Sequence, residues 1–308
     1  MLKALAASES AIFRYNSCMP SHPKVPACAA FVVGIAVSFA ALAQQAPPPA
    51  SAARILLVPR QIVSGERATL AVLDVNGRLT PGVIVDFSNG DRLTTDATGR
   101  ALFVAPLDPG VIYASIAQRP GRVRTTVLSS AEAAAASAIE VASAPRFASL
   151  TDRFEITGSG FCGDADANQV RVAGRPGLVL ASSPLSLVAV PPADLAPGPA
   201  VVGIACANRA SSSFSITFVS LSLEADSSPL VPGEQRTLTV HVNGTALKVG
   251  LEARNLAPEV ADLTGGNPSR ISSTGGADNL ARFVLVGRQH GSFLISMRLL
   301  PLAGPPRP

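Results

Sequence analysis

The residues that could do chemistry in this sequence are few, and the first candidate is a set of spaced glycines. Gly158, Gly160 and Gly163 have the G-x-G-x-x-G spacing of a dinucleotide-binding turn. That turn needs a helix directly after it and an acidic residue about 20 positions on. The residues that follow, DADANQVRV, predict a loop and then a strand, and residues 174–193 contain no Asp or Glu. We therefore expect no nucleotide site and no cofactor, and interpret the glycines as turn residues.

The second candidate is the acidic loop directly after these glycines. Asp164, Asp166 and Asn168 have the spacing of the first three oxygen ligands of a calcium loop. That loop type also needs Gly at its sixth position and Glu at its twelfth, where this sequence has Gln169 and Arg175. A calcium hand is therefore excluded. A looser surface calcium site at the three oxygen-bearing residues is kept as the alternative to a solvated acidic loop, and no other metal site is expected.

Catalytic side chains are scarce as well. His241 and His290 are the histidines left after the expected leader is removed, and a Ser/His/Asp triad would have to use one of them. His241 falls in a predicted strand and His290 in a predicted turn, and the sequence has no G-x-S-x-G, C-x-x-C, H-E-x-x-H or P-loop motif. We expect no catalytic residue and no enzyme activity. An unrecognised hydrolase is the least favoured alternative.

A small basic cluster surrounds the pair Pro120-Gly121. It consists of Arg119, Arg122 and Arg124, which could bind an anion or a carbohydrate or could be solvated residues of a hairpin. Carbohydrate sites commonly use aromatic rings as stacking platforms. The expected mature chain has no Trp and one Tyr, Tyr113, which weakens the carbohydrate interpretation.

The composition excludes several classes of protein. Hydrophobic residues make up 47% of the 308-residue chain, which is too many for a disordered protein. The net charge of +4 is too small for a typical nucleic-acid binder, so we expect no nucleic-acid partner. A polytopic membrane protein would have several apolar runs of about 18 or more residues, and this sequence has one such candidate.

That single apolar segment predicts the localisation of the protein. It covers residues 27–43, follows Lys24, and ends in Ala41-Leu42-Ala43, the small-x-small pattern of a signal-peptidase site. We expect residues 1–43 to be a cleaved signal peptide, with an uncleaved anchor as the alternative; a start at Met19 would give a leader of ordinary length. The protein is then exported to the periplasm, the cell surface or the medium, with no stable membrane span after cleavage.

Export also bears on the cysteines. Removal of residues 1–43 leaves Cys162 and Cys206. Two cysteines in an exported chain most simply form one disulfide, and two buried thiols are the alternative.

The mature sequence has the pattern of an all-β protein. From Arg54 onward, apolar stretches of four to eight residues alternate with Gly, Pro, Asn and Asp, and Asn-Gly pairs at 76–77, 89–90 and 243–244 predict tight hairpin turns. We expect three tandem β-sandwiches. The segments are a Pro/Ala-rich linker at 44–53, a first sandwich at 54–129, an Ala-rich linker at 130–145, a second sandwich at 146–219, a third at 220–302 and a tail at 303–308. The Ala-rich linker is expected to run into a strand near residues 139–141.

The first and third sandwiches repeat each other. Gly-Glu at 65–66 precedes Thr-Leu-x-Val at 69–72, and the same residues recur at 233–234 and 237–240. Further on, Ala-x-Phe-Val at 101–104 recurs at 281–284. Agreement at so many positions indicates two related domains on either side of a different one.

These motifs resemble known immunoglobulin-like families. Pro81 to Phe87 followed by Thr95 to Phe103 resembles the bacterial immunoglobulin-like domain of the invasin/intimin type, and residues 220–300 resemble it more weakly. FEITGSGF at 154–161 and NQVRVAG at 168–174 resemble the IPT/TIG immunoglobulin-like domain. The resemblance implies three tandem immunoglobulin-like β-sandwiches. In such a sandwich the second and sixth strands run the same way in facing sheets, so a disulfide between their ends is geometrically reasonable.

The function implied by this architecture is non-catalytic. We expect a surface or periplasmic binding module or a structural spacer, whose partner is a protein or cell-surface component and whose function lies on loops held by rigid sandwiches. The loop that starts at Asp164, beside Cys162, is the first one to test. The alternative is an accessory domain array of a polysaccharide-active or secretion complex.

Overall fold

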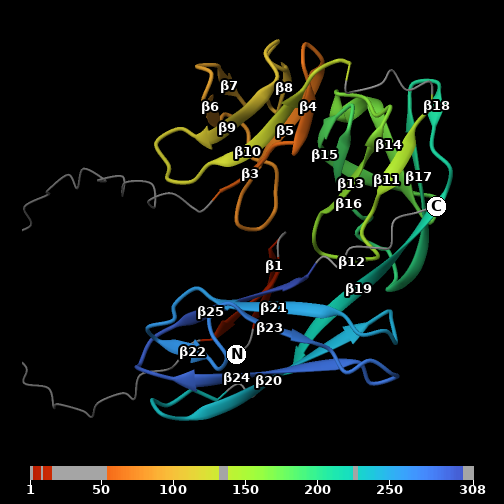
Figure 1. Cartoon of the computed structure of the whole chain (residues 1–308). Helices are drawn as coiled ribbons and strands as arrows, with labels where there is room; N and C mark the ends of the chain where they lie inside the picture. The colour runs from red at the N-terminus through yellow and green to blue at the C-terminus, as the bar shows by residue number, and fades with distance from the viewer. Residues whose placement is uncertain (1–2, 8–9, 16–53, 132–137, 225–227, 301–308) are drawn as a thin grey trace, which may run out of the picture.

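The computed structural model describes residues 3–7, 10–15, 54–131, 138–224 and 228–300. Within those ranges the chain folds into strands and one short 3-10 helix, so the prediction of an all-β protein built of sandwiches is confirmed. The apolar run at 27–43, the linker at 44–53, Met19 and the tail at 303–308 lie outside the described residues. Figure 1 shows the first two sandwiches side by side and the third below them.

The first sandwich packs a three-stranded sheet against a five-stranded one. Successive side chains of a strand point to opposite faces of the sheet, and those on the inner faces put Leu70, Val72, Val85 and Ala114 in a core with no solvent exposure. One sheet has the order β3-β5-β8 (Ile55–Leu57, Arg67–Leu73 and Arg100–Val104), and the other β4-β10-β9-β6-β7 (Gln61–Val63, Val123–Leu128, Gly110–Ile116, Ile84–Phe87 and Arg92–Thr94).

The second sandwich has a core of its own around Ile156, Leu187, Val202 and Ile216. The strands of one sheet follow the order β11-β13-β16-β15 (Glu140–Ser143, Phe154–Ser159, Ser186–Val190 and Arg175–Ser183). The other has the order β14-β17-β19 (Asn168–Val172, Gly198–Cys206 and Phe214–Glu224), flanked by β12 and β18 (Phe147–Ser149 and Arg209–Ala210). The 3-10 helix η1, Ala165–Ala167, lies just before β14.

One strand of this domain falls where a linker is expected. β11 lies within residues 130–145 and pairs antiparallel with β13, and the preceding Ile139 is buried in the domain core. Residues 132–137 of the same segment lie outside the described residues. The C-terminal part of the expected linker is therefore an edge strand of the second sandwich, because pairing with β13 and burial of Ile139 outweigh the weak strand propensity of an Ala-rich sequence.

The third sandwich packs the sheet β19-β20-β24-β22 against the sheet β1-β2-β25-β21-β23. Its core includes Leu251, Leu285, Ile295 and Met297. The strands not yet given are β1 and β2 (Lys3–Ala7 and Ser10–Tyr15), β20 and β21 (Gln235–Asn243 and Gly250–Asn255), β22 and β23 (Ala261–Leu263 and Ser269–Ser272), and β24 and β25 (Leu280–Gly287 and Phe293–Leu299). β1 and β2 thus fall in the segment expected to be a signal peptide.

No loop separates the second domain from the third. β19 is one continuous strand whose first half pairs with β17 and whose second half, from Ser220, pairs with β20. Figure 1 shows it running out of the second sandwich and into the third. The expected boundary between residues 219 and 220 therefore lies inside a strand, and a hydrogen-bonded strand is a stiffer connection than a loop.

The first and second domains share a separate apolar cluster. Leu73, Ala71 and Leu57 of the first domain pack against Leu180 and Val188 of the second. β5 and β15 also meet in an antiparallel pair at Thr69 and Ser182. This contact makes the first two sandwiches a packed pair.

Candidate functional site

The disulfide lies at the base of the acidic loop. Cys162 and Cys206 are joined, with their Cα atoms 5.8 Å apart, so the predicted pairing is confirmed. The bridge ties the start of the loop to the end of β17, whose Cys206 is buried. A cross-link at this point restricts how far the loop can move from the sandwich.

Hydrogen bonds within the acidic loop fix its shape. Asp164 accepts a hydrogen bond from the backbone N–H of Asp166 at 3.0 Å and caps η1. The side-chain amide of Asn168 donates to the carbonyls of Cys162 and Asp164, both at 2.8 Å, and its oxygen accepts from the Cys162 N–H at 3.0 Å. The loop therefore presents one defined backbone conformation.

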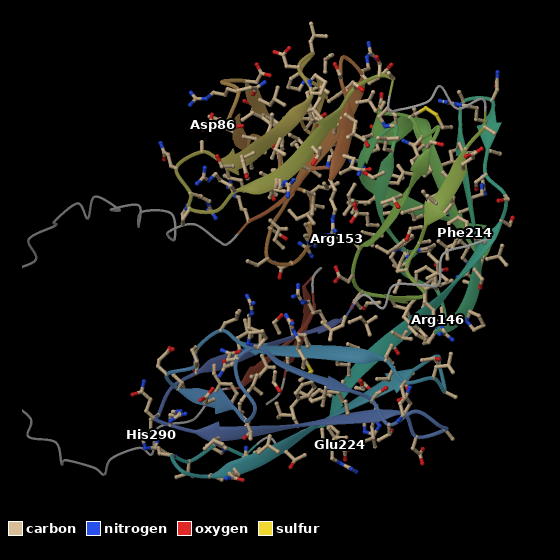
Figure 2. All side chains as sticks on the ribbon, in the orientation of Figure 1. Asp86, Arg146, Arg153, Phe214, Glu224 and His290 are labelled. Atoms are coloured by element: carbon tan, nitrogen blue, oxygen red, sulfur yellow. A yellow bond between two sulfur atoms is a disulfide. The ribbon has the colours of Figure 1, made fainter. Side chains whose placement is uncertain are left out.

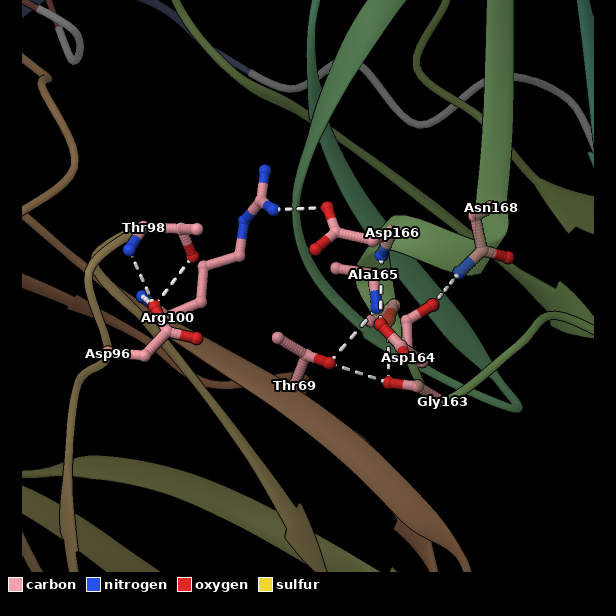
Figure 3. Close-up of polar contacts among 10 residues, drawn as sticks. Thr69, Asp96, Thr98, Arg100, Gly163, Asp164, Ala165, Asp166 and Asn168 are labelled. Atoms are coloured by element: carbon pink, nitrogen blue, oxygen red, sulfur yellow. Dashed lines mark hydrogen bonds and ion pairs between the residues drawn. The ribbon is translucent and has the colours of Figure 1, made fainter.

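This loop docks onto the first domain. Asp166 receives a hydrogen bond from the guanidinium of Arg100 at 2.5 Å, and the Thr69 hydroxyl donates to the Gly163 carbonyl at 2.8 Å. The Ser182 hydroxyl donates to the same carbonyl at 2.8 Å, and the Ala165 N–H donates to Thr69 at 3.1 Å. Figure 3 shows Arg100 and Thr69 reaching this loop from the first domain. The loop chosen from the sequence as a candidate binding loop therefore forms a domain junction.

These contacts bear on the calcium hypothesis without testing it. The side chains of Asp164, Asp166 and Asn168 each have a protein partner, and Figure 3 shows Asp166 and Asn168 on different sides of the loop. In the described ranges, no group of three or more His, Cys, Asp or Glu is placed to hold a metal ion. The surface calcium site stays a prediction.

The spaced glycines have a packing role. A Cβ atom on Gly158 would overlap the Glu140 carbonyl oxygen, and one on Gly160 would overlap that of Ala138. A Cβ atom on Gly163 would overlap the carbonyl oxygen of Arg67 in the first domain. Of the three, only Gly160 has a positive φ, at +80°, which is the backbone conformation that a turn glycine typically adopts. The interpretation as turn residues is therefore incomplete, because all three glycines are needed for close approach of another backbone segment.

The remaining candidates lie elsewhere. His241 is 3.1 Å from Glu224 across the β19–β20 pair, and His290 is exposed; Figure 2 shows Glu224 and His290 on separate parts of the third domain. In the basic cluster, the Arg122 guanidinium lies over the Tyr113 ring at 5.6 Å. The structure does not bring the histidines, the basic cluster and the acidic loop together.

A cleft of about 960 Å³ lies where the three sandwiches meet. Five arginines and three carboxylates line it together with apolar side chains from all three domains. The charged residues are Arg60 and Arg124 of the first domain, Asp152, Arg153 and Glu155 of the second, and Glu252, Arg254 and Arg298 of the third. Figure 2 shows Arg153 on the side of the upper two domains that faces the third.

Glu252 and Arg298 line the cleft on the third domain, and Arg270 lies beside Glu252 on the neighbouring strand. Glu252 on β21 is opposite Arg298 on β25 and Arg270 on β23, and both guanidiniums lie 2.7 Å from its carboxylate. The Glu252 side chain is 3% exposed, whereas both arginines are more than half exposed. Burial alone would raise the pKa of Glu252, but the hydrogen bonds and positive charges of Arg270 and Arg298 outweigh burial and hold the pKa below its usual value. One buried anion therefore orients two cations.

The opposite wall carries a weaker pair. Arg60 lies 2.9 Å from Glu155, and Arg60 is mostly exposed. Burial raises the pKa of Glu155, and the positive charges of Arg60 and Arg153 reduce this rise without cancelling it. Arg124 and Arg254 are exposed at the cleft and add positive charge from the first and third domains. The cleft as a whole is apolar and cationic, which suits a ligand with an acidic group and an apolar part.

Sequence reasoning missed this cleft except for Arg124. Its charged residues come from segments as far apart as residues 60, 153 and 298, and each one alone reads as a solvated side chain on a strand. The available signal was in the register: Glu252 and Arg254 alternate with the core residues Leu251 and Ala253, which places both charged residues on the outer face of one sheet.

No family model matches this chain, and no curated protein matches its sequence. In the described residues, no helix is long and apolar enough to cross a membrane.

Several solved structures are similar in architecture at low identity. The mixed-linkage glucan utilization protein SGBP-B of Bacteroides ovatus, in complex with a heptasaccharide, is 15% identical with a TM-score of 0.31, over 78% of this chain and 71% of that one. Immunoglobulin domains 1–4 of Sidekick-1 are 10% identical with a TM-score of 0.24, over 75% and 73%. The fibronectin(III)-like modules of Clostridium thermocellum CbhA are 15% identical with a TM-score of 0.18, over 54% and 93%. At these values the similarities carry no argument about function.

Proposed function

We propose that this chain is an exported, non-catalytic binding module of immunoglobulin-like domains, and that the cleft between its three sandwiches binds an acidic group of a cell-surface component. The observation that carries the proposal is the cleft lining of five arginines against three carboxylates. Arginine suits this role because its planar guanidinium pairs with carboxylate or phosphate groups in a fixed geometry.

Two features of the cleft support this role. Glu252 already neutralises part of the charge of Arg270 and Arg298 and fixes their positions, so less ordering is required when a ligand binds. Among the described residues, Arg124 and Arg254 have no such carboxylate partner, and they face the cleft from two different domains. A ligand that bridges them would contact both domains at once.

The proposal is tested by binding of an acidic polymer to the exported protein. We expect polygalacturonate to bind and neutral dextran not to bind, with affinity that falls as salt is added. The double variant Arg124→Ala, Arg254→Ala should bind polygalacturonate about tenfold more weakly, from roughly 0.7 kcal/mol for each exposed charge contact. Arg282→Ala is the matched control, because Arg282 is an exposed arginine on β24 outside the cleft.

Two results would contradict parts of this proposal. An equal loss in the control variant would mean non-specific attraction to a cationic surface and would contradict the cleft as the site. Turnover of an ester or glycoside substrate would contradict the non-catalytic assignment and favour a hydrolase.

The second candidate function is a structural spacer or an accessory array of a polysaccharide-active or secretion complex. The continuous strand β19 and the shared apolar cluster of the first two domains favour it, because both reduce motion between domains. A spacer would show no binding to the acidic polymer, and its particle dimensions in solution scattering would be those of one rigid arrangement.

A further inference from the structure

The third domain repeats the main strands of the first as far as β25, although β22 of the third domain and β4 of the first have no counterpart among the described strands. β20 corresponds to β5, and β24 corresponds to β8, as the repeated sequence motifs indicate. In the facing sheets, the antiparallel order β23-β21-β25 of the third domain matches the order β7-β6-β9 of the first. β25 is therefore the counterpart of β9.

The two domains differ in what lies beside that strand. In the first domain, the next strand along the chain, β10, pairs antiparallel with β9 from Val123↔Ala114 to Val127↔Gly110. By the same spacing its counterpart in the third domain would begin at Gly304, where the sequence reads Gly-Pro-Pro-Arg-Pro. Three of those five residues are prolines, which have no backbone N–H to donate to a sheet.

In the third domain, the N-terminal strand β2 lies beside β25 in the place that β10 has beside β9. β2 pairs antiparallel with β25 over five residue pairs, from Ala11↔Met297 to Tyr15↔Phe293. This is the orientation that β10 has on β9. β2 therefore stands in for the last strand of an immunoglobulin-like sandwich.

Cleavage of the signal peptide during export would remove β2. β2 lies within residues 1–43, the segment expected to be removed as a signal peptide. β25 would then keep β21 on one side and lose its partner on the other, which exposes backbone N–H and C=O groups along Phe293–Met297. Ile295 and Met297, which are 2% and 1% exposed, would lie at the opened edge of the core.

We infer that β25 of the exported chain is an acceptor site for a strand donated by a partner polypeptide. This inference rests on the proposed export with removal of residues 1–43. The donor is an extended segment of at least five residues that runs antiparallel to β25 and has no proline in its centre. It carries apolar side chains at alternate positions, because residues opposite Ile295 and Met297 share the core face with them. Such strand addition is an established mode of peptide recognition, with affinity from backbone hydrogen bonds and specificity from alternate side chains.

The test uses the full chain, expressed with its own leader in a bacterial host and purified after export. The intact mass first establishes whether the chain begins after Ala43. The probe is a synthetic peptide of residues 8–17, SESAIFRYNS, which contains the segment that the structure places on β25. The matched control is the same peptide N-methylated at residues 12 and 13, since adjacent N–H groups of a strand point in opposite directions and one of the two must face β25.

The readout is amide hydrogen exchange of β25 compared with β9. β9 serves as the internal reference because β10 already covers it. We expect the β25 amides to exchange at least tenfold faster than those of β9 in the free exported chain. The peptide should slow exchange in β25 and leave β9 unchanged, and the N-methylated peptide should have no effect.

Three results would overturn the inference. The first is an exported chain that retains residues 10–15, because its own β2 then holds the position. The second is a free monomer in which the β25 amides are as protected from hydrogen exchange as those of β9. The third is a dimer whose β25 edges protect each other, because the acceptor site is then filled by a second copy. None of these results depends on whether the cleft binds an acidic polymer, so the two proposals fail separately.

Discussion

The Arg100 guanidinium lies 2.5 Å from the carboxylate of Asp166, across the boundary between the first and second domains. The side chain of Arg100 is 7% exposed and that of Asp166 is 74% exposed. A buried cation is thus paired with an anion that water can reach. The pair, together with the hydrogen bonds of Thr69 to the same loop, gives the acidic loop a role in holding two domains together.

The first prediction concerns this ion pair. Asp166→Asn should weaken the contact between the first two domains by about 1 kcal/mol, because Arg100 loses its counter-charge while solvent screens part of the loss. Domain-resolved hydrogen exchange in β5 and β15 measures the effect. Asp108→Asn is the control, since Asp108 is exposed and lies outside the junction. Equal exchange in the two variants would show that the ion pair does not stabilise the junction.

The second prediction concerns Gly163 at the same junction. Gly163→Ala should loosen the contact by about 1–3 kcal/mol, because its Cβ would overlap the Arg67 carbonyl oxygen and force the loop away from Thr69. Gly203→Ala is the matched control, because a Cβ there meets nothing within 4 Å. Thermal unfolding of both variants checks this, and a Gly163 variant as stable as the control would contradict the close packing.

Local patterns in the sequence predicted the elements well and their partners poorly. Alternating apolar residues and Asn-Gly turns are local signals, so the all-β sandwich class could be predicted, and the cysteine pair followed from export. A strand near residues 139–141 could be predicted, but its place in the second sandwich could not, because its pairing with β13 is a contact that the local sequence does not contain. The boundary inside β19 was missed because the sequence of a strand that pairs with two different domains has the same apolar pattern as that of a strand that pairs with one.

The domain junction and the cleft are formed by residues far apart in the sequence, so no local sequence pattern predicts them. Asp166 reads as a solvated loop residue until Arg100, 66 positions earlier, is placed beside it. The arginines of the cleft are likewise spread over three domains. The glycine spacing at 158–163 was visible, but its cause is the approach of other backbone segments, which the sequence of that segment does not contain.

The third prediction concerns pH and Glu252. The folded pKa of Glu252 lies below its usual value of 4.5, so its stabilising effect is present above about pH 4.5 and is lost as the pH falls through the folded pKa. Glu252→Gln should therefore cost about 1 kcal/mol at pH 7 and progressively less in acid. The free energy of unfolding of the third domain, measured from pH 7 to pH 3 for both proteins, checks this. A difference that does not shrink in acid would contradict it.

The fourth prediction concerns the disulfide. The double variant Cys162→Ala, Cys206→Ala should lose about 4 kcal/mol of stability in the second domain, because the bridge closes a loop with a sequence separation of 44 residues. Denaturant unfolding under non-reducing conditions measures the loss. Reduction of the natural protein should give nearly the same decrease, and alkylation of both thiols in the non-reduced protein would contradict the pairing.

The fifth prediction has the opposite sign and concerns Glu155. Burial holds the folded pKa of Glu155 above its usual value of 4.5, so its contribution favours folding fully below about pH 4.5 and is lost as the pH rises through the folded pKa. Glu155→Gln, which imitates the protonated form, should stabilise the second domain at pH 7 by under about 1 kcal/mol, and the loss of the exposed Arg60 partner should subtract little. The gain should vanish near pH 3, where the natural side chain is protonated. A variant less stable than the natural protein at pH 7 would mean that the Arg60 pair outweighs burial.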